Sequence, residues 1–114
     1  MHYVYFIAPV GKNEGPVKIG ITYNLRQRLR GLQTACPMQL ECFEYIEVPD
    51  DNPIEIEQCL HTMLRHRRTT GEWFNISRSE IPAVVQMAFN MLGLGDMIVY
   101  DHGGILPEPV KASA

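Results

Sequence analysis

Two charged side chains at the edges of apolar helical stripes are the first candidates for chemistry. At about 100° per residue, Arg28 falls on the edge of a leucine stripe, and Glu57 lies on the flank of a second apolar stripe. An arginine beside a core requires an anionic partner, because an unpaired charge is costly to desolvate. That partner can be a protein carboxylate, which gives a structural salt bridge, or a ligand. The stripes consist of Leu25, Leu29 and Leu32 in the first segment and Ile56, Leu60, Met63 and Leu64 in the second.

Glu57 and His61 are four residues apart and are therefore neighbours on one helical face. Such a pair can bind a metal, exchange a proton, or only stabilise the helix. A pair of only two residues favours helix stabilisation over a zinc site, since zinc needs three or four protein ligands. A single carboxylate completed by water is nevertheless a normal way to hold Mg²⁺ beside a phosphate.

The three cysteines offer an alternative metal site. Cys36, Cys42 and Cys59 could bind zinc only if they converged with His61, and their spacing lacks the short C-x₂₋₄-C unit of structural zinc sites. An odd number of cysteines without a secretion signal also argues against a disulfide framework. We therefore expect buried thiols in a reduced compartment.

Composition limits the class of protein. The chain has 114 residues, 46% of them hydrophobic and 20% charged, with a formal net charge of −3. These values indicate one soluble globular domain. No stretch approaches a membrane span and no signal peptide is evident, so we expect a cytoplasmic protein without a membrane partner. The net charge excludes a histone-like binder that is basic over its whole surface.

The charges are unevenly distributed along the chain. Residues 18–30 contain four basic side chains and no acidic one, whereas acidic residues concentrate in residues 41–57. A locally basic face is the electrostatic footprint that phosphate-backbone binding requires. Arg26 and Arg30 share an exposed helical face, where phosphate contacts and plain solvated charge fit equally well.

Hydrophobic periodicity and turn signals predict the elements that position these residues. β-Branched and aromatic runs predict strands, Asx and Ser/Thr caps predict helix starts, and glycine and proline mark the breaks. Strands are expected at residues 2–8, 17–21 and 39–48, a short strand or extended segment at 72–76, and one more short strand at 97–100. Helices are expected from Thr22 or Asn24 to about Gln33, from Pro53 to about Arg67, and from Ser79 and Pro82 to near Gly93.

Five motifs occur in order through residues 3–77. They are Val4-Tyr5-Phe6-Ile7, Lys18-Ile19-Gly20-Ile21-Thr22, Asn24-Leu25 with Arg28-Leu29, Glu57 with Leu60 and His61, and Gly71-Glu72-Trp73-Phe74. In this combination the chain resembles the GIY-YIG nuclease superfamily, in the phage and bacterial branch that has KIG in place of YIG.

The resemblance implies a fold and an activity. The fold is α+β, a small three-stranded antiparallel sheet flanked by helices, here with an extra C-terminal helix. Residues 1–93 would form the nuclease domain, and residues 94–114 an extension that is partly disordered or docked. The activity is hydrolysis of DNA phosphodiester bonds with one divalent metal, Mg²⁺ or Mn²⁺.

The resemblance also implies roles for individual residues. Tyr5 matches the general base or water-positioning tyrosine, Arg28 the arginine that binds the scissile phosphate, and Glu57 the metal ligand. Gly20 matches the glycine at the floor of the substrate cleft. Asn75 is a candidate for an asparagine that comes late in the domain.

Lys18 replaces the second tyrosine of the family pattern. A tyrosine of unperturbed pKa near ~10 is a poor base at neutral pH, so positive charge must favour its phenolate. Lys18 could supply that charge or contact a phosphate directly. The role of the missing tyrosine could pass to Tyr3, Tyr23 or His61, whose imidazole titrates near pH ~6.5 when unperturbed.

The sequence thus predicts a metal-dependent DNA endonuclease. Two alternatives stay open: a DNA-binding module on the same fold without hydrolysis, and an interaction or regulatory protein. The short chain leaves little room for a recognition module, so specificity would come from loops, a protein partner or self-association through the C-terminal helix. Without metal and partner, we expect weak DNA affinity.

Overall fold

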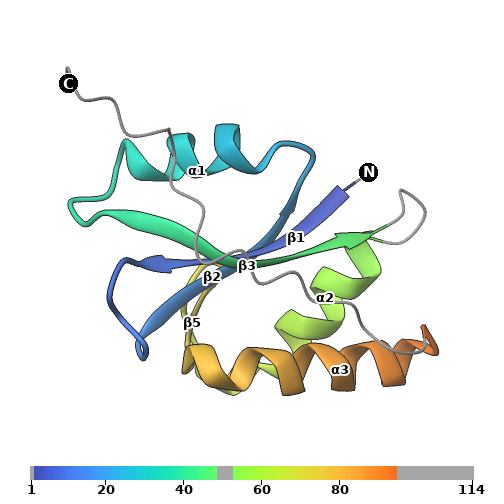
Figure 1. Ribbon diagram of the computed structural model, residues 1–114. Coiled ribbons are helices and arrows are strands. Elements are labelled where there is room, and N and C mark those ends of the chain that lie inside the picture. Colours follow the sequence, from blue (N-terminus) through green and yellow to red (C-terminus); the bar gives the residue numbers. More distant parts are fainter. Residues whose placement is uncertain (1, 49–52, 95–114) are drawn as a thin grey trace.

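The structure, a computed structural model, describes residues 2–48 and 53–94. An antiparallel sheet with strand order β3-β1-β2-β5-β4 separates helix α1 from helices α2 and α3 (Figure 1). The α+β class is therefore confirmed. The elements are β1 (His2–Pro9), β2 (Pro16–Thr22), α1 (Leu25–Gln33), β3 (Leu40–Val48), α2 (Pro53–Met63), β4 (Arg68–Thr70), β5 (Trp73–Asn75) and α3 (Ile81–Leu92), with 3₁₀ turns at Arg65–Arg67 and Arg78–Glu80.

The sheet has two more strands than the three-stranded core expected. The strands predicted at 2–8, 17–21 and 39–48 form its β3-β1-β2 part, and the segment predicted at 72–76 forms β5 beside β2. The outer strand β4 was not predicted. Helix α2 ends at Met63 instead of near Arg67, because Leu64 leaves the helical conformation (φ −101°, ψ 12°) and the chain then reverses into the β4–β5 hairpin. The strand predicted at 97–100 and the extension at 95–114 lie outside the described residues.

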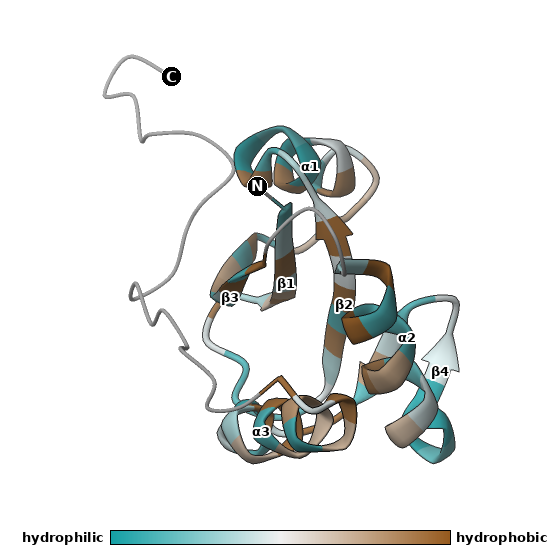
Figure 2. Cartoon of the chain, turned by 90° about the vertical axis from the view of Figure 1, so that its right-hand side faces the viewer, coloured by the Kyte–Doolittle hydropathy of each residue, from teal (hydrophilic) through white to brown (hydrophobic). Residues whose placement is uncertain are grey.

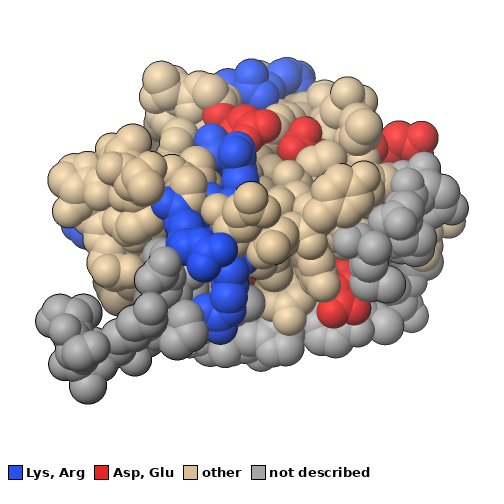
Figure 3. Space-filling model, turned by 90° about the horizontal axis from the view of Figure 1, so that it is seen from above, with Lys and Arg blue, Asp and Glu red and all other residues tan. Residues whose placement is uncertain are grey.

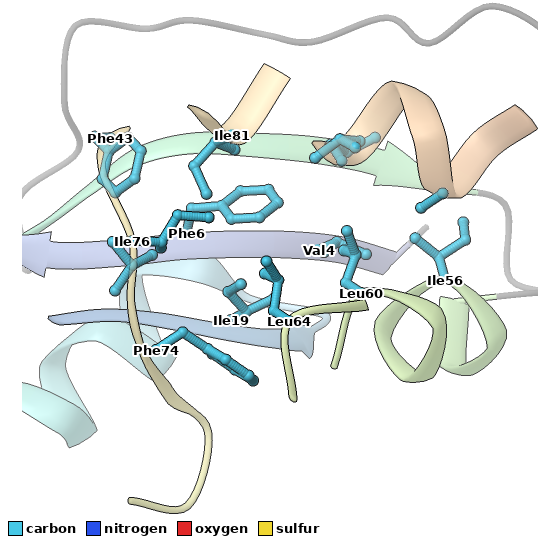
Figure 4. Close-up of a cluster of buried hydrophobic side chains, with 14 of the residues drawn as sticks. Val4, Phe6, Ile19, Phe43, Ile56, Leu60, Leu64, Phe74, Ile76 and Ile81 are labelled. Carbon is cyan, nitrogen blue, oxygen red and sulfur yellow. The ribbon is translucent and has the colours of Figure 1, made fainter. Parts of the chain in front are cut away.

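Strand β1 lies between β3 and β2 and is buried on both faces, which explains its unbroken apolar sequence. Val4, Phe6 and Ala8 face the larger core beneath α2 and α3, a cluster that Figure 4 shows in close-up. Tyr5 and Ile7 face the smaller core beneath α1. Alternation along one strand thus sends Tyr5 to the α1 side of the sheet.

The helices bury the stripes predicted for them. Leu29 of α1 is buried against the sheet, and Ile56 and Leu60 of α2 are buried on the opposite face. In Figure 2 the apolar sides of the helices are turned toward the sheet. None of the described helices is both long and apolar enough to span a membrane.

Candidate active site

Tyr5 lies across strand β2 at a glycine. Tyr5 and Gly20 are direct partners in the β1–β2 ladder. A Cβ atom added to Gly20 would lie 2.4 Å from the Tyr5 hydroxyl oxygen and 2.6 Å from Cζ. The tyrosine ring therefore occupies the space that any side chain at position 20 would fill, and its hydroxyl is held above the β2 backbone.

Helix α1 brings Arg28 to this hydroxyl. The Asn24 side chain caps the helix by accepting a hydrogen bond from the Gln27 N–H, and buried Leu29 fixes the helix on the sheet. Nε of the exposed Arg28 donates a hydrogen bond to the Tyr5 hydroxyl at 3.1 Å. Burial raises the pKa of Tyr5, and Arg28 only partly offsets this effect. The phenol is therefore neutral at physiological pH.

Three potential metal ligands converge beside this pair. One side-chain donor atom each from Glu57, His61 and Glu72 lies within 4.8 Å of the others. Glu57 and His61 were predicted to be neighbours, but no role was predicted for Glu72. Burial, and next the nearby Glu72, raise the pKa of Glu57, while His61 and Arg28 act in the opposite direction. The group is thus a partly buried acidic cluster whose charge repulsion a cation would relieve.

His61 and Glu72 also hydrogen-bond the backbone of β2 at the point where its pairing with β5 ends. Strand β5 pairs with β2 only over Pro16–Lys18. Beyond it, the backbone N–H of Ile19 donates to the Glu72 carbonyl at 3.2 Å, and His61 Nε2 lies 2.8 Å from the Ile19 carbonyl. A carbonyl only accepts, so Nε2 carries the proton. The remaining ring nitrogen, Nδ1, lies 3.4 Å from a guanidinium nitrogen of Arg68.

Lys18 lies at this site and contacts the acidic cluster. Its ammonium group is 3.5 Å from the Glu72 carboxylate, its side chain is only 11% exposed, and it packs over the Trp73 ring. Lys18 is therefore a counter-ion to Glu72. The partner that Arg28 finds within the described residues is the Tyr5 hydroxyl, whereas the Glu72 carboxylate pairs with Lys18.

Comparison with known families agrees with this geometry. Residues 2–89 match the T5orf172 domain, a span that includes every residue of the cluster. The chain belongs to this family. The T5orf172 domain is phage-associated, is related to nucleases of the GIY-YIG and HNH-like types, and is nuclease-like or DNA-binding. No curated protein and no solved structure matches the chain.

Other predicted residues of this T5orf172 domain lie apart from the cluster. Asn75 pairs with Pro16, four residues from Gly20 along β2, which is about 13 Å in a strand. It lines a shallow groove with Arg67 and Glu80. The structure therefore does not bring Asn75 to the site.

The remaining arginines lie on α1. Arg26 lies at the start of the helix, in a pocket described below, and Arg30 lies in its last turn. Figure 3, seen from the α1 side, shows lysine and arginine side chains in a band across this face, with acidic side chains beside them. The charge distribution along the sequence predicted such a locally basic face.

The zinc alternative is wrong for this T5orf172 domain. Cys36 and Cys42 belong to the core beneath α1, whereas Cys59 packs in the core on the other face of the sheet. All three thiols are free, as expected. Burial also raises the pKa of Cys42 to about 12, which opposes the thiolate form that zinc binds.

Proposed function

We propose that this T5orf172 domain is a metal-dependent endonuclease of the GIY-YIG type that hydrolyses DNA phosphodiester bonds. The convergence of the Tyr5–Arg28 pair with the Glu57, His61 and Glu72 cluster at one edge of β2 supports the proposal. Phosphodiester hydrolysis needs a cationic phosphate clamp, a site for a divalent metal and a group that orients water. These three parts lie within electrostatic range of one another, since Arg28 and Glu57 both perturb the pKa of Tyr5.

The cluster fits Mg²⁺ or Mn²⁺. Carboxylate oxygens are the preferred ligands of both ions, and imidazole nitrogen is better tolerated by Mn²⁺. Glu57 and Glu72 would hold the ion, with His61 Nδ1 as a further ligand after a shift of Arg68. When bound, the ion would supply a Lewis acid beside the phosphate and lower the pKa of a water molecule.

Arg28 would bind the scissile phosphate. Its Nε is fixed by Tyr5, so the guanidinium is oriented before substrate arrives, and the side chain is exposed to incoming DNA. A guanidinium placed where negative charge develops stabilises the transition state.

Tyr5 would position water instead of deprotonating it. A phenol whose pKa is raised by burial is a poor base, but its oxygen accepts from Arg28 and its proton is available to orient a neighbour. His61 would act as a ligand and as an anchor of β2, because its Nε2 is engaged with the Ile19 carbonyl. Lys18 would balance the charge of Glu72.

Nicking of supercoiled plasmid with Mg²⁺ or Mn²⁺ tests the proposal. Wild type should nick, whereas Glu57→Ala and Tyr5→Phe should not. Glu55→Ala is the matched control, because Glu55 is exposed on the same helix two residues away. Nicking that survives both site substitutions refutes the assignment.

A DNA-binding module without hydrolysis is the second candidate. The observation that favours it is the burial of Lys18 in an ion pair at the position of the family tyrosine. Salt-dependent DNA binding without nicking on several substrates would support this candidate over the nuclease. A protein partner or self-association through α3 is a separate proposal, which the exposed Met87 and Met91 support.

A further inference from the structure

A pocket lined by three tyrosines adjoins the Tyr5–Arg28 pair on the α1 side of the sheet. Tyr3 of β1 and Tyr45 of β3 meet edge to face, with ring centroids 5.5 Å apart. Tyr23 precedes α1, is 72% exposed and lies with its ring 3.8 Å from that of His2. The pocket is lined by Tyr3, Tyr23, Asn24, Leu25, Arg26 and Tyr45.

The position of this tyrosine pocket relates it to the candidate active site. Tyr3 is two residues from Tyr5 on the same face of β1, about 7 Å away at the rise of a strand. Arg26, which lines the pocket, is carried by the same helix α1 as Arg28. Successive nucleotides are about 3.4 Å apart along the axis of a stacked DNA helix and farther apart in an unstacked strand. A strand whose phosphate binds Arg28 would therefore bring a neighbouring nucleotide to the pocket.

We propose that the tyrosine pocket binds an unstacked nucleobase of the DNA strand, one or two nucleotides from the phosphate held by Arg28. The inference rests on the proposed nuclease function and makes DNA with unpaired bases the preferred substrate class. An exposed aromatic ring stacks on any base, since every base has a π-face. Arg26 at the rim and the basic residues of α1 favour a polyanion over an apolar peptide.

Binding of two DNA probes to the full chain in EDTA tests this inference. One is a duplex with a central bubble that contains 2-aminopurine, and the other is the same sequence fully paired. The wild type should bind the bubble more tightly and quench its fluorescence by stacking. Tyr23→Ala should weaken bubble binding about 5- to 10-fold, with little effect on the duplex.

Two variants serve as controls. Tyr23→Phe keeps an aromatic ring and should bind as the wild type does. Val10→Ala removes an exposed apolar side chain just beyond the far end of β1 and should bind both probes as the wild type does.

The possible failures are distinguishable. DNA binding or nicking without preference for the bubble, or an unchanged affinity of Tyr23→Ala, overturns the base pocket but not the nuclease. A further probe is free 2-aminopurine nucleotide. If the protein quenches the fluorescence of this nucleotide but shows no preference for the bubble, the pocket is a small-ligand site, and the base-pocket proposal is overturned. A wild type that neither binds nor nicks DNA overturns both proposals.

Discussion

Replacement of Gly20 by alanine tests the geometry on which the candidate site depends. The added methyl carbon would lie 2.4 Å from the Tyr5 hydroxyl oxygen, whereas ordinary van der Waals contacts begin at 3.4 Å. The ring or the strand must therefore yield by about 1 Å. Tyr5 is only 1% exposed and is packed in the core beneath α1, so its ring cannot swing into solvent.

Two effects of this displacement can be estimated. Overpacking of a core costs about 1–3 kcal/mol, and each kcal/mol lowers the melting temperature of a domain of this size by roughly 4–8 °C. The shift would also stretch the 3.1 Å hydrogen bond from Arg28 Nε to the Tyr5 hydroxyl. Misplacement of a positioning group by about 1 Å can slow a reaction by about 100-fold.

Thermal melts and initial nicking rates at saturating Mg²⁺ measure these effects. Gly31→Ala is the matched control: Gly31 lies in α1 with nothing near its added Cβ, so alanine should stabilise the helix by about 0.5–1 kcal/mol without loss of nicking. A Gly20→Ala variant that melts and nicks as the wild type does refutes the placement of Tyr5. A lower melting temperature with unchanged nicking refutes the role of Tyr5 in catalysis.

Three further predictions follow from the site and its support. Glu57→Gln should abolish metal-dependent nicking. At neutral pH it should stabilise the fold by about 0.2–1 kcal/mol in calorimetry. The pKa of Glu57 is raised in the folded state, so the wild type loses stability as the pH rises through that pKa and the carboxylate becomes charged, whereas glutamine stays neutral. The gain should vanish at pH values below 4.5, the ordinary pKa of glutamate, where Glu57 is protonated in the folded and unfolded states. Arg28→Lys keeps the charge but not the planar guanidinium, and single-turnover nicking should fall by about 10²–10³-fold. The lost Nε hydrogen bond to Tyr5 should lower the melting temperature by roughly 4–8 °C. Arg78→Ala removes hydrogen bonds to the Lys12 and Pro9 carbonyls and to Glu41, so urea denaturation should show a loss of about 2–3 kcal/mol with unchanged nicking per folded molecule.

Local patterns were sufficient to predict most elements of this fold. The apolar run of β1, the Asn24 cap of α1 and the leucine stripe that buries Leu29 each reflect interactions between residues close in sequence. The end of α2 was mispredicted, because the chain turns at Leu64 toward the β4–β5 hairpin, whose strand β5 pairs with the distant strand β2. Helical periodicity carries no signal for such a reversal.

The chemistry of the site was predictable only in part. Helical geometry identified Arg28 and Glu57, and their resemblance to a family pattern indicated a role. The ion pair between Glu72 and Lys18 joins segments far apart in sequence, so neither residue carries a local signal for it. The raised pKa of Tyr5 depends on burial between β2 and α1, which only the three-dimensional structure reveals.

The exposed edge of β2 explains why structural and catalytic roles fall on the same side chains. Where β5 ends, the backbone groups of β2 still need partners, and α2 supplies them through His61. A helix held this close to the strand must also place Glu57, one turn earlier, beside the Ile21 backbone and Tyr5. Loss of His61 should therefore weaken both the sheet and the proposed metal site, whereas Glu57→Gln separates the two by removing metal affinity without weakening the fold.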